Sequence, residues 1–143
     1  MNSEYNLQRF IAAQNLVYSD AIGTLRRGMM CTRYLEIIFP RLAARRRDAR
    51  PDPYAIASLD EARAYLSSPV LGGRYRECIG VLQRLAGSRA CAVFGDEDSK
   101  KLHASLTLFS EASNDEFLLQ TMFDVWFDGL LDEHTMNELN RSS

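Results

Sequence analysis

Hydrophobic residues recur three or four positions apart over most of this chain, which is the spacing of helices with one buried face. The clearest pattern begins at Pro69, a residue suited to the first position of a helix, and runs to about residue 86, where Gly87 can end it. Its apolar face comprises Leu71, Tyr75, Cys78, Ile79, Leu82 and Leu85. Cys78 is therefore expected to be a small core residue rather than a nucleophile.

The same patterning predicts helices in the N-terminal part of the chain. We expect a short helix over residues 5–14 and a second over residues 16–27, with Asn15 as its N-cap and Gly28 as its stop. The inner face of the second helix would hold Tyr18, Ala21, Ile22 and Leu25. Residues 32–40 fit helix or strand by periodicity alone. Helix is favoured, because no other segment offers a strand partner.

Further helix signals follow toward the C-terminus. Ser58 and Glu61 have the spacing of a capping box and open one helix. A short turn of helix is expected at residues 89–94, and a longer helix after Gly95. A helix over residues 115–127 would be capped by Ser113 or Asn114 and stopped by Gly129; Asp132 would cap a last one ending near Leu139. The predicted fold is all-α, with seven or eight helices and little or no sheet.

At 143 residues the chain fits a single compact domain over residues 1–143. We expect frayed ends at residues 1–4 and 141–143. An arginine-rich loop is predicted at residues 41–53, where two prolines disfavour helix.

The helix after Gly95 carries polar residues within its apolar arc. Asp98, Lys101 and Ser105 fall among the hydrophobic positions, so they must either be paired or line a cleft. In the functional interpretation Lys101 holds an anionic group that Asp98 or Ser105 orients, with Tyr54 or Phe39 nearby. In the structural interpretation the helix dipole favours Asp98 in the first turn, Lys101 extends past apolar neighbours, and Ser105 bonds to a carbonyl one turn back. Both interpretations stay open.

Charge is segregated along the chain although the net charge is only −2. Residues 26–50 hold eight arginines against two acids, whereas residues 96–143 hold eleven acids against three basic residues. The candidates for an anion-binding loop are Arg41, Arg45, Arg46 and Arg47. They suit a small anionic ligand or an acidic protein partner. Nucleic acid is not favoured, because the net charge is negative and the loop lacks interleaved aromatic residues.

Metal and cofactor chemistry is not indicated. The three cysteines are far apart and form no CxxC pair, which suits a reducing compartment such as the cytoplasm. His103 and His134 lack partners at helical spacing, so both are expected to be surface histidines and no metal site is predicted. No signal peptide or membrane span is evident. The oligomeric state cannot be read from these features.

The order of several phrases resembles the bacterial domain-of-unknown-function 1810 family, whose members are sometimes mislabelled calpastatin. The matching phrases are residues 6–15 (NLQRFIAAQN), 38–40 (IFP), 54–66 (YAIASLDEARAYL), 69–72 (PVLG), 94–95 (FG), 101–102 (KL), Ser105, 107–109 (TLF) and 127–129 (FDG). The resemblance covers nearly the whole chain and implies an essentially all-helical domain. It implies no particular reaction.

The chain also departs from that family's pattern. A tryptophan-rich phrase before Ile38-Phe39-Pro40 and a glycine-rich loop after it are replaced, the loop by arginines, and Ser68 stands where a histidine is usual. We therefore favour a binding or interaction module for a small molecule or a protein, with a pocket lined by the helix of residues 98–109. The alternative is an enzyme acting on a small anionic or nucleotide-like ligand through Asp98, Lys101 and Ser105.

Overall fold

The computed structural model describes residues 6–29, 32–43, 53–85, 95–113, 117–127 and 129–142, and within these ranges it contains seven helices and no strand. The helices are α1 (Gln8–Arg26), α2 (Thr32–Ile38), α3 (Leu59–Ser67), α4 (Pro69–Gln83), α6 (Asp96–Ala112), α7 (Phe117–Trp126) and α8 (Glu133–Ser142). The predicted all-helical fold is confirmed. None of the described helices combines the length and the apolar composition needed to cross a bilayer.

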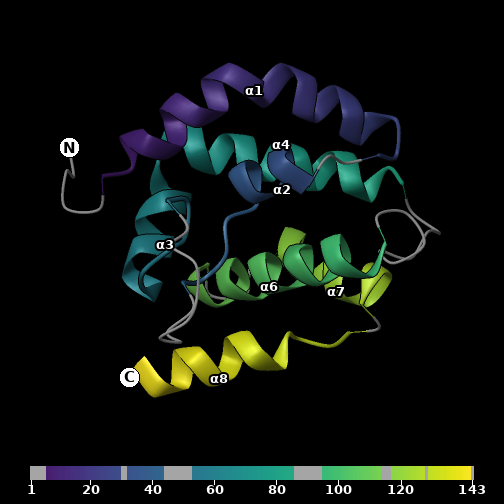
Figure 1. Cartoon of the computed structure of the whole chain (residues 1–143). Coiled ribbons are helices and arrows are strands. Elements are labelled where there is room, and N and C mark those ends of the chain that lie inside the picture. The colour runs from purple at the N-terminus through teal and green to yellow at the C-terminus, as the bar shows by residue number, and fades with distance from the viewer. Residues whose placement is uncertain are drawn as a thin grey trace.

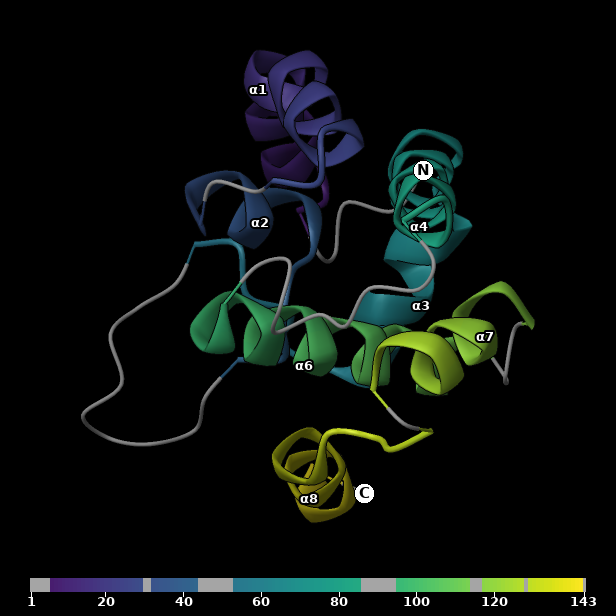
Figure 2. The same ribbon diagram turned by 90° about the vertical axis from the view of Figure 1, so that its right-hand side faces the viewer.

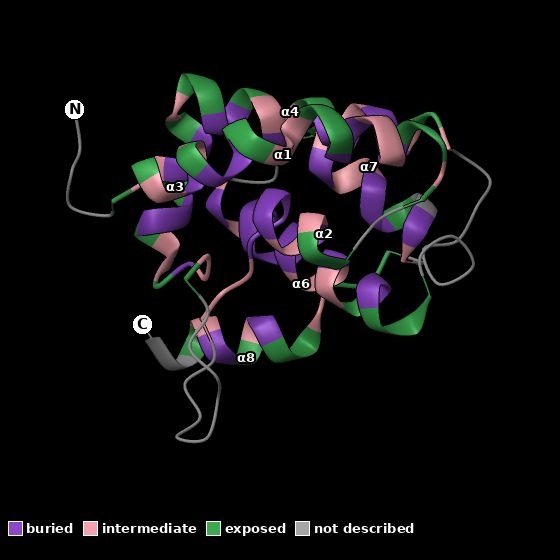
Figure 3. Cartoon of the chain, turned by 45° about the horizontal axis from the view of Figure 1, so that its top comes forward, coloured by how far each residue is buried: buried purple, intermediate pink, exposed green. Residues whose placement is uncertain are grey.

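Helix α6 lies at the centre of the arrangement. It contacts α2, α3, α7 and α8, while α1 packs against α2 and α4 (Figure 1). Turned by 90°, the molecule shows α1 and α4 end-on above α6, and α8 alone below it (Figure 2). Colouring by burial shows the inner faces of these helices converging on the same interior (Figure 3).

An aromatic cluster occupies the core where α3, α4 and α6 meet. The ring of Tyr75 lies 4.5 Å from that of Phe109, and Tyr65 lies 5.1 Å from Phe109, between ring centroids. The predicted face of α4 is buried against this cluster, Cys78 included. Burial raises the pKa of the Cys78 thiol to about 12, so little thiolate forms at neutral pH. Its prediction as a core residue is confirmed.

The prediction of two helices separated at Asn15 is wrong, because α1 is a single helix from Gln8 to Arg26. It runs unbroken through that position, and Asn15 accepts a hydrogen bond from Arg74 Nη2 at 2.7 Å instead of capping a helix. Gln14 explains the error, because a polar residue fills a core position and hides the continuity of the pattern. Its amide nitrogen donates to the Tyr65 hydroxyl at 2.8 Å, which compensates for burial. Gly28, at φ +74°, ends α1 as expected.

Most other predicted helix ends are confirmed. Ser58 Oγ accepts from the Glu61 amide at 3.1 Å, and Asp132 Oδ2 accepts from the Thr135 amide at 3.0 Å. Gly129 adopts φ +77° after α7. Helix α8 continues to Ser142 instead of ending near Leu139, since neither glycine nor proline follows. The predicted turn at residues 89–94 and the cap at residue 114 lie outside the described residues.

The segment after α2 contains a backbone pairing that the hydrophobic pattern did not predict. Residues 32–38 are helical, as favoured, and the chain then forms a single parallel bridge between Leu42 and Ile56. The Ile56 amide donates to the Arg41 carbonyl at 2.8 Å, and the Ala43 amide donates to the Ile56 carbonyl at 2.7 Å. Residues 44–52 of the predicted loop lie outside the described residues.

A polar anchor joins the start of α1 to the start of α3. Arg9 donates to Glu61 Oε2 at 2.8 Å and to the carbonyl oxygens of Pro53 and Ala55 at 2.8 and 3.0 Å. The other Glu61 oxygen accepts from the Ala57 amide at 2.7 Å. The Glu61 side chain is only 3% exposed, so its charge depends on these partners.

Replacing Glu61 by alanine is expected to lower the free energy of unfolding by about 2–3 kcal/mol, because it removes the acceptor of two partly buried donors, the Arg9 guanidinium and the Ala57 amide. The matched control is Asp60→Ala, which removes an exposed carboxylate paired with Arg63 on the same helix and should change the free energy by under about 0.5 kcal/mol. Urea unfolding measures both. Equal losses for the two variants would contradict the assignment of Glu61 as an anchor.

Two adjacent glycines of α4 provide a second test of packing. A methyl group at Gly72 would lie 2.1 Å from the Leu66 carbonyl oxygen, whereas one at Gly73 would meet nothing within 4 Å. Gly72→Ala should therefore destabilise by about 2 kcal/mol or more, since the α3 and α4 backbones must separate. Gly73→Ala should stabilise by about 0.5–1 kcal/mol through helix propensity. Thermal unfolding of the two variants would show opposite shifts, and shifts of the same sign would contradict this packing.

Candidate functional site

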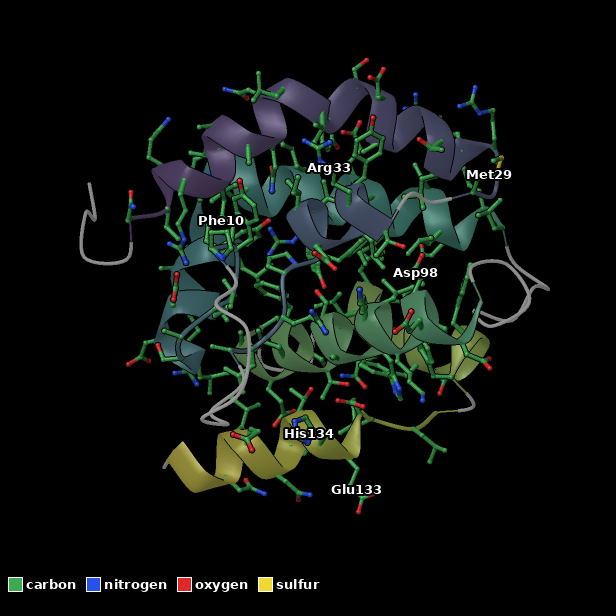
Figure 4. The ribbon with its side chains drawn as sticks, in the orientation of Figure 1. Phe10, Met29, Arg33, Asp98, Glu133 and His134 are labelled. Carbon is green, nitrogen blue, oxygen red and sulfur yellow. The ribbon has the colours of Figure 1, made fainter. Side chains whose placement is uncertain are left out.

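The three polar residues in the apolar arc of α6 are each held by a neighbouring helix. Asp98, near the start of α6 (Figure 4), accepts hydrogen bonds from the Thr32 hydroxyl at 2.9 and 3.0 Å. Lys101 forms a salt bridge of 2.8 Å with Glu36. Their partners Thr32 and Glu36 both belong to α2. These contacts account for two charges on a face that turns toward other helices.

Ser105 is fully buried and bonds across the core. Its hydroxyl lies 2.9 Å from the Tyr75 hydroxyl of α4. Burial raises the pKa of Tyr75 well above its usual value, so the phenol stays protonated. The pair gives each hydroxyl a partner in an otherwise apolar region.

The two aromatic candidates lie in different surroundings. Phe39 is buried against Tyr75 with ring centroids 5.4 Å apart, and half-buried Tyr54 lies 6.3 Å from Phe10. The structure therefore places Phe39 in the core beside the tyrosine that bonds Ser105, while Tyr54 packs near α1. A ligand-binding role for Asp98, Lys101, Ser105, Tyr54 and Phe39 stays a prediction.

A double-mutant cycle tests the Ser105–Tyr75 bond. Ser105→Ala should lower the free energy of unfolding by about 1–3 kcal/mol, because the buried Tyr75 hydroxyl loses its partner. In a Tyr75→Phe background the same change should cost far less, with a coupling of at least about 1 kcal/mol. Urea unfolding of the four proteins measures it. Additive effects would show that the two hydroxyls do not support one another.

A pocket of about 110 Å³ lies on the other side of α6, where α8 and the segment after α2 approach it. Of the predicted site residues that the structure describes, Arg41 alone lines it. Arg45, Arg46 and Arg47 lie outside the described residues. The lining residues are Arg41, Leu42, Ala43, Ala104, His134, Thr135 and Glu138.

The pairing with Ile56 fixes one wall of this pocket. Ile56 is fully buried, and its backbone bonds flank Leu42 on both sides, so Arg41 and Ala43 are held by main-chain atoms. The Arg41 side chain forms no hydrogen bond or salt bridge with any described residue, although every guanidinium N–H can donate. The backbone is thus set while the guanidinium remains available to a ligand.

Helix α8 supplies the opposite wall. His134 and Glu138 are one turn apart, so they share a face of α8, whereas Glu133 points away from α6 (Figure 4). The Asp132 cap fixes the first turn of the helix. The Asp132 amide in turn donates to Thr107 Oγ1 of α6 at 2.8 Å, which ties the start of α8 to α6.

The two histidines differ from each other. His134 is exposed, as predicted, yet it borders the pocket. His103 is not a freely exposed residue: it is half-buried, its ring stacks on Phe127 at 4.1 Å, and its Nε2 lies 2.6 Å from the Leu130 carbonyl oxygen. The correction arises because the chain after α7 folds back over α6. Contrary to the expectation from sequence, His134 has a carboxylate residue at helical spacing: Glu138 follows at i+4, and this spacing was the readable sign of a shared face.

Metal binding gains no support from this geometry. No group of three or more His, Cys, Asp or Glu side chains within the described ranges is placed to hold a metal ion. Among the lining residues that the structure describes, Arg41, His134 and Glu138 carry ionisable side chains, and the others are apolar apart from Thr135. Such groups bind and orient a polar ligand.

The fold and the pocket define a small all-helical protein with a mixed-charge site. The chain belongs to the family described as protein of unknown function DUF1810, whose model matches residues 4–139. It is also similar to the conserved hypothetical protein Rv1873 from Mycobacterium tuberculosis. The two are 32% identical, with a TM-score of 0.85, over 95% of this chain and 97% of that chain. No curated protein matches the chain.

Proposed function

We propose that this protein is a binding module that holds the anionic group of a small ligand in the pocket between α6, α8 and residues 41–43. The observation that carries the proposal is Arg41, which lines the pocket on a segment fixed by the Ile56 pairing. A guanidinium binds a carboxylate or phosphate through two parallel hydrogen bonds. His134 at the rim can add a further donor.

The size of the pocket limits what it can enclose. Its volume of about 110 Å³ is well below the range of about 300–1,000 Å³ that is usual for drug-sized ligands. A whole nucleotide does not fit in such a space. A small acid does, and so does the carboxylate tip of an acidic side chain presented by a protein partner.

The enzyme alternative has less support. Lys101 and Ser105 already have protein partners at 2.8 and 2.9 Å, and Asp98 is bonded to Thr32. A ligand at those side chains would first have to displace α2 or enter the aromatic core. The pocket at Arg41 requires neither.

A thermal-shift titration with inorganic phosphate, acetate and L-alanine tests the proposal. At least one of these compounds, each of which carries a carboxylate or phosphate group, should raise the melting temperature by several degrees at saturation, since a ligand at a hundred times its Kd stabilises by about 2.7 kcal/mol. Arg41→Ala should abolish the shift without unfolding the protein, because Arg41 contributes to the Ile56 pairing through its backbone.

Arg33→Ala is the matched control, since Arg33 is an exposed arginine of α2 that does not line the pocket. This variant should retain the wild-type shift (Arg33 is labelled in Figure 4). Equal shifts in wild type and Arg41→Ala, or no shift with any of the three compounds, would refute the proposal.

A further inference from the structure

The volume of the pocket between α6, α8 and residues 41–43 limits the ligand more tightly than its charge does. A cavity of about 150 Å³ holds benzene, which has six non-hydrogen atoms, so the volume of about 110 Å³ here scales to about four. Acetate has four such atoms, inorganic phosphate has five and L-alanine has six. The volume therefore favours a very small carboxylate over the other two compounds.

Few of the side chains that line the pocket can donate a hydrogen bond to an anion. Thr135 cannot, because its hydroxyl donates to Asp132 Oδ2 at 2.6 Å and its amide donates to the same oxygen at 3.0 Å. Of the described lining residues, Arg41 and His134 have the side chains that can donate. One guanidinium satisfies both oxygens of a carboxylate through two parallel hydrogen bonds, whereas phosphate has two further oxygens that need donors of their own. These donors therefore suit a carboxylate better than a phosphate.

Three of the described lining residues are apolar. Leu42, Ala43 and Ala104 present side chains without polar atoms, and the Ala43 amide already donates to the Ile56 carbonyl at 2.7 Å. Glu138 interacts within the protein, so no part of the ligand is assigned to it. A ligand of this site therefore needs a small apolar group beside its carboxylate, and a methyl group meets that need.

We infer that the pocket binds a short monocarboxylate of the size of acetate. Its carboxylate pairs with the Arg41 guanidinium, and its methyl group packs against Leu42, Ala43 and Ala104. The inference rests on the proposed function, because Arg41 holds the anionic group in both. It adds the class of ligand, and it assigns Ala104, which α6 contributes to the described lining, as the residue that limits the chain length of the ligand.

Calorimetric titration of the wild-type protein with formate, acetate, propionate and butyrate at constant ionic strength tests the inference. Acetate should bind most tightly. Formate should bind about fourfold more weakly, because it lacks the buried methyl group. Propionate and butyrate should bind at least about tenfold more weakly than acetate, because their added carbons overfill the pocket. Equal Kd values for acetate and butyrate, or affinity that rises with chain length, would overturn the inference.

Two alanine-to-glycine variants test the role of Ala104. Ala104→Gly removes the methyl group that borders the pocket, so propionate should bind this variant at least as tightly as acetate does. Ala64→Gly is the matched control, because Ala64 is a half-buried alanine of α3 that does not line the pocket and its replacement costs similar helix propensity. The control should keep the wild-type preference for acetate. An unchanged preference in Ala104→Gly would exclude its role, and if that variant does not fold, the four wild-type Kd values decide the inference.

The two proposals fail in different ways. If phosphate or L-alanine binds through Arg41 and acetate does not, the pocket holds an anion and the inference of an acetate-sized ligand alone is wrong. If none of these three compounds raises the melting temperature, the proposed function is wrong as well. Acetate binding that survives Arg41→Ala would overturn both proposals, because the carboxylate would then be held elsewhere.

Discussion

The burial of α6 is the constraint on which the rest of the structure depends. A helix with neighbours on several sides must pair its polar side chains through those neighbours, because an unpaired buried charge costs several kcal/mol. Asp98 and Lys101 meet this requirement through α2, and Ser105 meets it through Tyr75 of α4. The polar residues of α6 thus specify where α2 and α4 lie, while its apolar residues provide most of the burial.

The side of α6 that faces α8 is packed differently from the side that faces α2 and α4. Toward α8 the contacts include buried Thr135 and Glu138, with a cavity beside them. A polar interface with a cavity gains less from burial than an apolar one. The described contacts that hold α8 include the bond from the Asp132 amide to Thr107 and the partly buried Leu139. A binding pocket is compatible with such an interface, because a ligand there would displace little apolar packing.

Phrases shared with the DUF1810 family acquire physical reasons from this fold. Gly72 lets the backbones of α3 and α4 approach so closely that a side chain would collide with the Leu66 carbonyl. Ser105 and Phe109 both contact Tyr75. Glu61 accepts hydrogen bonds from the Ala57 amide before α3 and from Arg9 of α1. These residues account for packing and anchoring, and Ser68 caps α4 by accepting a hydrogen bond from the Leu71 amide at 3.2 Å.

The amino-acid sequence by itself determined the helical class, the buried face of α4 and most helix ends, because periodicity, caps and glycine stops act within a few residues. It did not reveal the continuity of α1, since Gln14 takes a core position through a bond to Tyr65, far along the chain. It proposed Arg41 but not its neighbours in the pocket, although Asp98, Lys101 and Ser105 were rightly expected to need partners. Tertiary structure alone brought Arg41 to His134 and Glu138, because the pairing with Ile56 and the docking of α8 join segments about a hundred residues apart.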